Sequence, residues 1–203
     1  MSEDKVLVLR TCDAEMRSSH GGFVWPESGP VSAPDWDPTP KCGRGLHGLL
    51  RGEGDGTLLA WEDSAKWLVV EVLACEIVLL DDGEKVKFPR GVVVYAGHRC
   101  TATAMIAERY PAAAAVGAIR SAGYRGTATA GYRGTATAGY GGTAIAGDYG
   151  TAAAGDGGTL AIWYSDADCR RRLAVAYVGE GGILPNVAYR LDPQTQKFVE
   201  ARG

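Results

Sequence analysis

The chain has 203 residues, a formal net charge of -3 and a sequence pI near 5.6. That length allows one or two small domains with cores of their own, and the charge lacks the basic excess of proteins that bind nucleic acid or anionic membranes. No stretch approaches the ~18 apolar residues of a membrane span, and the charged start MSEDKVLVLR lacks the apolar run of a signal peptide. These features predict a cytoplasmic protein without nucleic-acid or membrane partners.

Residues 1–111 have the composition of an ordinary globular α+β domain. Strands are expected at 5–10, 66–80 and 85–97, where apolar and β-branched residues dominate. A helix is expected over 100–110, because Pro111 would end it. Residues 62–67, EDSAKW, predict a further short helix with acids early and a lysine late, as the helix dipole favours. Residues 26–45 are rich in Pro, Gly and Asp and predict a long ordered loop.

Residues 112–162 repeat one eight-residue pattern, Gly-Tyr-x-Gly-Thr-Ala-x-Ala. Five copies align from Gly123 to Ile162, and one or two degenerate copies precede them. The glycines suit tight corners, and the alternation within TATA suits a short strand. Alanine is a poor strand former, so its regular place indicates a thin core that admits only small side chains. The pattern predicts a β-solenoid with alanine inward, threonine outward and two octads, ~16 residues, per coil. A disordered Gly/Ala-rich linker is the alternative.

Residues 163–203 return to a globular composition, with strand-like runs separated by turns. A solenoid needs its ends covered, since an open end exposes unpaired backbone groups. The sequence therefore predicts a mainly β protein in three parts: an N-terminal α+β domain (1–111), an octapeptide-repeat β-solenoid (112–162) and a C-terminal β cap (163–203).

The layout resembles a family of phage and bacterial proteins without an assigned activity. The resemblance rests on a C-x-x-G-L-H stretch, Cys42 to His47, on the glycine-led repeats and on the final phrase from Ile183 to Ala201. It implies a phage-associated protein, in the bacterial host cell or in the virion. Its partner would be a phage or host protein, including a virion component or a defence factor.

The octads also resemble the AGYGST-x-T repeats of bacterial ice nucleation proteins. Gly-Tyr-Gly at 139–141 and the Thr-x-Thr pairs of the first two octads match that pattern. The later copies are Thr-x-Ile, Thr-x-Ala and Thr-x-Ala. Since an ice-binding face needs a long regular threonine array, two intact copies argue against ice binding.

The first functional hypothesis is a non-enzymatic interaction protein. With two octads per coil, Tyr124 and Tyr140 fall in one column, and Tyr132 and Asp148 share another. Aromatic columns suit contacts with a partner or with a second copy, or they simply cover the corners. The sequence thus predicts a protein partner and a homodimer or larger oligomer packed through the repeats. The candidate binding residues are Tyr124, Tyr132, Tyr140, Thr127, Thr129, Thr135 and Thr137.

The second hypothesis is an enzyme in the N-terminal domain. The segments VLVLR, GRGLHGL and WLVVEV resemble the strand pattern of ADP-ribosyltransferase-like folds. That resemblance implies a nicotinamide cofactor held by Arg10 or His47, with Glu71 or Glu76 as the catalyst. The structural alternatives are a hydrogen-bonded His47 and a solvent-facing Glu71 on an alternating strand.

The sequence predicts neither a metal nor a cofactor. Cys42, His47, His98 and Cys100 are close in sequence, but their spacing matches no zinc knuckle. The five cysteines lack a C-x-x-C pair, which suits a reducing compartment and mostly buried free thiols.

Overall fold

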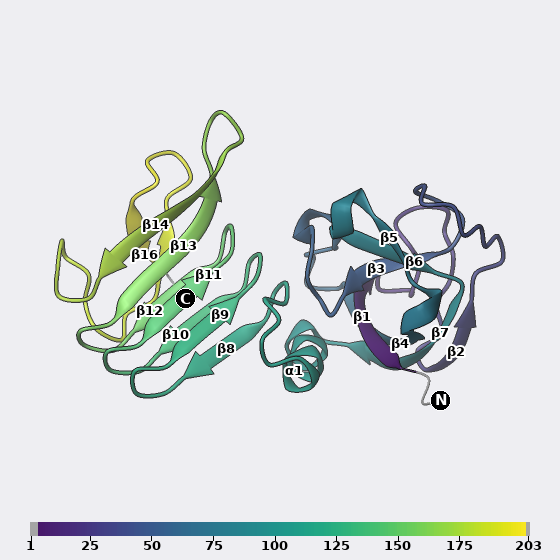
Figure 1. Cartoon of the computed structure of the whole chain (residues 1–203), viewed down its shortest axis with the longest axis horizontal. Helices are drawn as coiled ribbons and strands as arrows, with labels where there is room; N and C mark the ends of the chain where they lie inside the picture. Colours follow the sequence, from purple (N-terminus) through teal and green to yellow (C-terminus); the bar gives the residue numbers. More distant parts are fainter. Residues whose placement is uncertain (1–3, 202–203) are drawn as a thin grey trace. The chain divides into compact units, whose positions relative to one another are not determined.

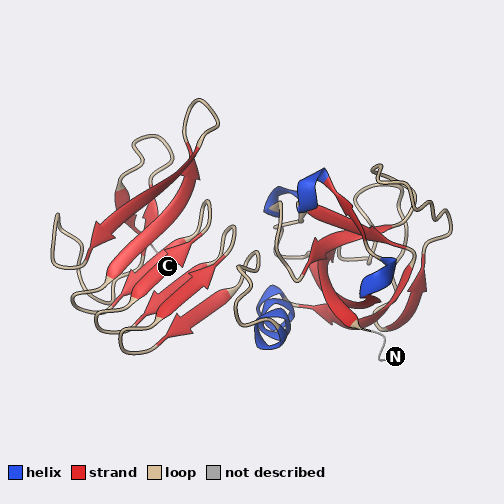
Figure 2. Ribbon diagram, in the orientation of Figure 1, coloured by secondary structure: helices blue, strands red, loops and turns tan. Residues whose placement is uncertain are grey.

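The computed structural model describes residues 4–201 and divides the chain into two compact units, Met1–Ala113 and Ala114–Gly203. Strands dominate both units (Figure 2), and α1 (Arg99–Arg109) is the one α-helix in the described range. The chain is therefore mainly β, as the sequence predicts. The finer division at residues 111 and 162 stays a prediction.

The first unit is built on one antiparallel seven-stranded sheet of order β2-β7-β4-β1-β3-β6-β5 (Figure 1). β1 and β4 pair along their full length, with Lys5 opposite Leu73 and Cys12 opposite Lys66. Helix α1 packs against β1, β4 and β7. The strands are β1 (Lys5–Cys12), β2 (Gly29–Ser32), β3 (Leu46–Leu50), β4 (Lys66–Leu73), β5 (Val78–Leu80), β6 (Lys85–Phe88) and β7 (Arg90–Gly97), with single 3-10 turns at Gly56–Leu58, Ala74–Glu76 and Asp81–Gly83.

Two local predictions for this unit are wrong. The segment expected as a short helix, residues 62–67, is a turn followed by the start of β4 at Lys66. Pairing with β1 outweighs the weak helix preference of those six residues. The Pro-rich segment 26–45 is not only a loop, because it contains β2, which pairs with β7 at the edge of the sheet. The helix expected over 100–110 is confirmed as α1.

The second unit contains two sheets of parallel strands contributed by alternate octads. β8 (Ile119–Ala122), β10 (Thr135–Ala138) and β12 (Thr151–Ala154) form one, and β9 (Thr127–Ala130), β11 (Thr143–Ala146) and β13 (Thr159–Ser165) form the other. Within a sheet the register sets Thr127 opposite Thr143 and Thr143 opposite Thr159, a shift of sixteen residues. The predicted coil of two octads is therefore confirmed, and the degenerate copy before Gly123 supplies β8.

Alanine fills the space between the two sheets. The second and fourth residues of each TATA strand, such as Ala136, Ala138, Ala144 and Ala146, are buried together in one cluster. The threonines that alternate with them face outward and are exposed or half-buried. The inward alanine and outward threonine predicted from the alternation are confirmed. The core is thin because a methyl group is the largest side chain at most of its inward positions.

The C-terminal tail adds antiparallel strands to both sheets. β14 (Arg171–Tyr177) pairs with β13, β15 (Tyr189–Leu191) pairs with β12, and β16 (Phe198–Glu200) pairs with β15. The core widens at this end, where Leu160 and Ile162 replace alanine and pack with Val178, Ile183 and Tyr189. The Tyr189 hydroxyl accepts a hydrogen bond from the Leu184 N–H at 2.9 Å. The tail thus seals the end of the alanine core.

Candidate interaction surface

The corners of the solenoid repeat with the octads. The third octad residue has a positive φ at every corner, which turns the chain from one sheet to the other. These residues are Arg125, Arg133, Gly141, Tyr149 and Gly157, with φ between 50° and 65°. Successive coils are joined there by main-chain hydrogen bonds, including Arg125 N–H to the Tyr140 carbonyl and Arg133 N–H to the Asp148 carbonyl, each 2.9 Å. Side chains at matching corners are therefore held one coil apart.

This spacing stacks two tyrosines on one corner. The rings of Tyr124 and Tyr140 are 5.8 Å apart between centroids and only 5° from parallel. Their residues are 69% and 55% exposed, and the Arg125 guanidinium lies 5.3 Å from the Tyr124 ring. The column expected from two octads per coil is present, and it presents flat aromatic surface to solvent.

The opposite corner carries a second aromatic pair that the sequence interpretation missed. Tyr132 packs edge to face against Tyr149, with ring centroids 5.7 Å apart. The main chain places Asp148 in the column of Tyr132, as the sequence predicts. However, the fourth octad has its tyrosine one residue later, in the phrase GDYG. This shift of the tyrosine by one position is visible in the sequence and could have predicted the second aromatic pair. It makes Tyr149 a further candidate for a binding role.

Only some of the outward threonines form continuous columns across the sheets. Thr127, Thr143 and Thr159 line up across one sheet, but the next column is Thr129, Ile145 and Ala161. Thr135 and Thr137 lie on the other sheet, where Thr137 is followed by Ala153. Each sheet therefore carries one intact Thr-x-Thr pair. A binding role for these threonines and for the tyrosines stays a prediction.

The candidate catalytic residues of the first unit do not share a site. The register sets Val8 opposite Leu50. Because the pairing is antiparallel, this register places Arg10 of β1 opposite Gly48 of β3. His47 is adjacent to Gly48 and therefore points to the other face of the sheet. Glu71 pairs with Lys5 at 2.8 Å, and Glu76 pairs with Arg90 at 2.6 Å.

The surroundings of Arg10 and His47 favour structural roles. The Arg10 guanidinium lies 4.0 Å from the Trp25 ring centroid and donates to Ser18 Oγ at 3.2 Å. Burial lowers the pKa of Arg10, and burial together with the positive charge of Lys85 lowers the pKa of His47. Arg10 Nε and His47 Nε2 are buried without a hydrogen-bond partner among the described residues. A neutral imidazole at neutral pH follows for His47.

One open groove in this unit does contain a candidate residue. Glu71 lines it with Lys5, Arg51, Arg109 and Tyr110, beneath the end of α1. Arg10, His47 and Glu76 do not line this groove. The geometry thus adds nothing to the enzyme hypothesis, which stays a prediction.

The residues considered as metal ligands are also dispersed. Cys42 Sγ accepts a hydrogen bond from Lys85 Nζ at 3.4 Å, while His98 precedes α1 and Cys100 lies in its first turn. In residues 4–201, no group of three His, Cys, Asp or Glu side chains is placed to hold a metal ion. The absence of a metal requirement stays a prediction. The expectation of mostly buried thiols is wrong, because only Cys12 is buried and the other four cysteines are exposed.

Comparison with curated proteins finds relatives that match about half of this chain. The chain is similar to the ice nucleation protein of Pseudomonas fluorescens, with 44% identity over 108 residues, 53% of this chain and 9% of that protein. Similarity to ice nucleation protein InaU of Pantoea ananas is 41% over 106 residues, 52% of this chain and 10% of that protein. For the ice nucleation protein of Xanthomonas campestris pv. translucens it is 40% over 111 residues, 55% of this chain and 7% of that protein.

These matches confirm the resemblance of the octads to ice nucleation repeats. The chain spans about a tenth of the length of these curated relatives. No protein-family model matches it, and no solved structure matches it. The resemblance to a phage family finds no support among the matches.

The comparisons also correct one prediction. Ice nucleation proteins are typically displayed at the outer membrane surface, which conflicts with the cytoplasmic location predicted from the start of the chain. In the described residues, α1 is too short to cross a membrane, and the structure contains no other candidate helix.

Proposed function

We propose that the octapeptide unit is a protein-interaction module through which copies of this chain associate, by the corner that carries Tyr124 and Tyr140. The observation that carries this proposal is the exposed parallel stack of the two rings. Their positions are fixed by main-chain hydrogen bonds between coils, so little side-chain or backbone ordering is left for binding. Tyrosine is also enriched at protein interfaces because it offers a large rigid ring with a polar tip.

A second copy is the partner that needs the fewest assumptions. Two such columns have the same spacing along the solenoid axis, so their rings match in an isologous contact about a twofold axis. A phage or host protein on the same surface is the other occupant that the sequence suggests. The relatives give no support to a phage association, and therefore the proposal commits to a second copy.

Self-association would be tested by light scattering on the full chain over a range of concentrations. We expect the wild type to associate and the triple variant Tyr124→Glu, Tyr132→Glu, Tyr140→Glu to lose this contact, because the four glutamates at positions 124 and 140 of the two copies would meet across the interface. The matched control is Val24→Glu, Val92→Glu, Val94→Glu, which places equal charge at exposed apolar positions outside the repeats. A tyrosine variant that associates as the control does would end the proposal.

Ordering of water or ice by the threonine columns is a second candidate. It is favoured by the names of the relatives and by the intact Thr-x-Thr pairs of β9 and β10. Each sheet offers only one such pair beside Ile145, Ala153 and Ala161, so the regular array is short. Droplet freezing with the wild type and a Thr127→Lys, Thr129→Lys variant tests it. Equal freezing temperatures for the two proteins would exclude this role for the Thr-x-Thr pair of β9.

A further inference from the structure

Strand β14 forms a free edge of the four-stranded sheet of the second unit. The order of that sheet is β14-β13-β11-β9, and β14 pairs only with β13 in the described part of the chain. It has seven residues, whereas β16 at the end of the other sheet has three. A long edge strand offers a row of unpaired N–H and C=O groups to another chain.

The outer face of this edge strand is apolar. Leu173, Val175 and Tyr177 alternate along β14 and are 42%, 47% and 54% exposed. On the next strand, the half-buried Trp163 lies opposite Leu173, and the buried Ala161 lies opposite Val175. Natural edge strands are usually protected by charge, proline or a bulge, and none of these interrupts the row from Leu173 to Tyr177.

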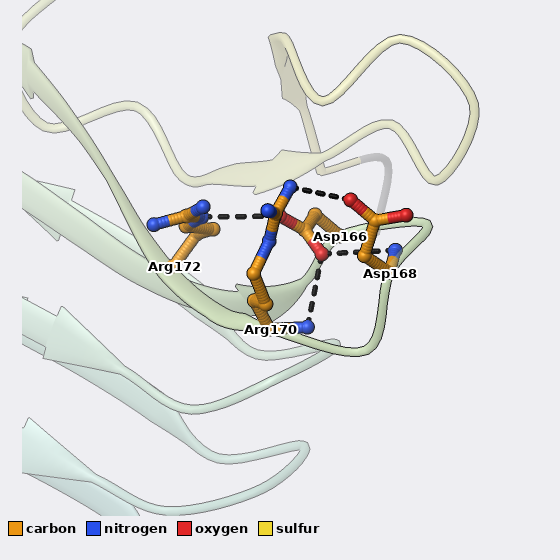
Figure 3. Close-up of polar contacts among 4 residues, drawn as sticks. All are labelled: Asp166, Asp168, Arg170 and Arg172. Carbon is orange, nitrogen blue, oxygen red and sulfur yellow. Dashed lines mark hydrogen bonds and ion pairs between the residues drawn. The ribbon is translucent and has the colours of Figure 1, made fainter.

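The hairpin that leads into β14 is fixed by ion pairs (Figure 3). The Asp166 carboxylate accepts from Arg170 Nε at 3.0 Å and from Arg172 Nε at 3.1 Å, and Arg170 also contacts Asp168. The Arg171 guanidinium packs over the Trp163 ring, 4.9 Å from its centroid. The first residues of β14 are therefore held in place before any partner arrives.

Charge favours an antiparallel partner of the same sequence. Arg170, Arg171 and Arg172 outnumber Asp166 and Asp168, so the start of β14 has a net positive charge. Glu180 lies just beyond the other end of the strand and is exposed. In an antiparallel pair of β14 strands, the positive start of each copy would lie beside Glu180 of the other. A parallel pair would place like charges together.

We propose that β14 is a self-association edge, at which two copies join their four-stranded sheets by antiparallel β14–β14 pairing about a twofold axis. A register with Val175 opposite Val175 of the second copy sets Leu173 opposite Tyr177 of the second copy. Both outward rows then lie on the same face of one continuous sheet, since a twofold axis perpendicular to the sheet preserves its faces. This contact uses no residue of the tyrosine corner and is independent of the function proposed above.

Two different isologous contacts on one chain join more than two copies, in a closed tetramer or an open-ended assembly, whereas one alone makes a dimer. We therefore expect species larger than dimers for the wild type in sedimentation velocity. The Tyr124→Glu, Tyr132→Glu, Tyr140→Glu variant should stop at a dimer joined by β14. Val175→Lys should stop at a dimer joined by the tyrosines, because two lysines would lie directly opposite each other. The combined variant should be a monomer.

The matched control is Ile119→Lys, an outward and 57% exposed position on β8 at the edge of the other sheet. It should leave the size distribution as in the wild type. Equal distributions for Val175→Lys and Ile119→Lys would overturn the β14 proposal, and so would a tyrosine variant that is monomeric. A tyrosine variant that forms the same large species as the wild type would instead overturn the function proposed above.

Hydrogen exchange tests the pairing without changing β14. In the tyrosine variant, amides of Arg171–Tyr177 should exchange more slowly as protein concentration rises, because pairing protects the outward N–H groups. Amides of Thr127–Ala130 should show no such change. Exchange in Arg171–Tyr177 that does not depend on concentration would overturn the proposal.

Discussion

Gly147 rests directly on Gly131 of the coil before it. Its N–H donates to the Gly131 carbonyl at 3.3 Å and to the Ala130 carbonyl at 3.0 Å. A β-carbon on Gly147 would lie 2.5 Å from the carbonyl carbon of Gly131 and 2.6 Å from the nitrogen of Tyr132. The first glycine of the octad is thus required by contact between two backbones, in addition to any turn preference.

Gly147→Ala should therefore destabilise the solenoid. The added methyl group meets main-chain atoms that cannot rotate away, and we expect a loss on the order of 1–3 kcal/mol in the free energy of unfolding. Gly123→Ala is the matched control, because Gly123 starts the first octad and has open space around its missing β-carbon. Urea unfolding of both variants measures the difference. Equal losses would contradict the close approach between coils.

The thin alanine core makes a second prediction. Ala136 has no exposed surface between the two sheets, so Ala136→Leu should overpack them and cost on the order of 1–3 kcal/mol. Thr127 faces outward and is exposed, and Thr127→Val should change stability by less than about 0.5 kcal/mol. Thermal and urea unfolding of the two variants would test this ranking. The reverse order would mean that the faces are assigned wrongly.

The Asp166 hairpin should make stability depend on pH. The Arg170 N–H, followed by the guanidinium groups of Arg170 and Arg172, holds the pKa of Asp166 below its ordinary value of 3.8. A lowered folded-state pKa stabilises the fold above pH 3.8, and this contribution is lost as pH falls through the lower folded-state pKa. Asp166→Asn should therefore be less stable than the wild type at neutral pH, and the two should converge well below pH 3.8.

Urea unfolding at a series of pH values would measure that convergence. Asp63→Asn is a suitable control, since Asp63 is exposed and no ion pair is seen for it in the described residues. Its difference from the wild type should be smaller than that of Asp166→Asn at neutral pH. A gap between Asp166→Asn and the wild type that is constant from neutral to acidic pH would contradict the role of the carboxylate.

Thiol reactivity should separate one cysteine from the other four. Burial raises the pKa of the Cys12 thiol, and its side chain packs in the core of the first unit. Cys42, Cys75, Cys100 and Cys169 are exposed and free. Titration of the native protein with a thiol reagent should modify four cysteines, and the fifth only after denaturation. Modification of five thiols in the native protein would contradict the burial of Cys12.

The two units differ, for a physical reason, in how far the sequence predicts their structure. In the repeats, each strand pairs with one sixteen residues away, so a local pattern determines the long-range register and the stack of Tyr124 on Tyr140. In the first unit the neighbours of a strand are set by tertiary pairing. β1 lies between β3 and β4, and no local pattern encodes that order.

The same distinction explains why the sequence could not place the candidate residues of the first unit relative to one another. Arg10 and His47 are brought near each other by the β1–β3 pairing, but strand alternation turns their side chains to opposite faces. That outcome depends on a register that the sequence does not reveal. Tyr149 could have been found, because its displacement by one position is visible in the fourth octad.

The alternation of octads between two sheets also limits how such a chain can change length. Because β14 pairs with the last octad strand and β15 with the one before it, a single octad inserted before β12 would carry the whole tail to the opposite sheets relative to β8 and β9. It would also lengthen one sheet and not the other. Insertion of two octads would keep every strand in its own sheet and lengthen both sheets equally. Duplications and deletions that keep the tail in place relative to β8 and β9 are therefore expected in steps of sixteen residues.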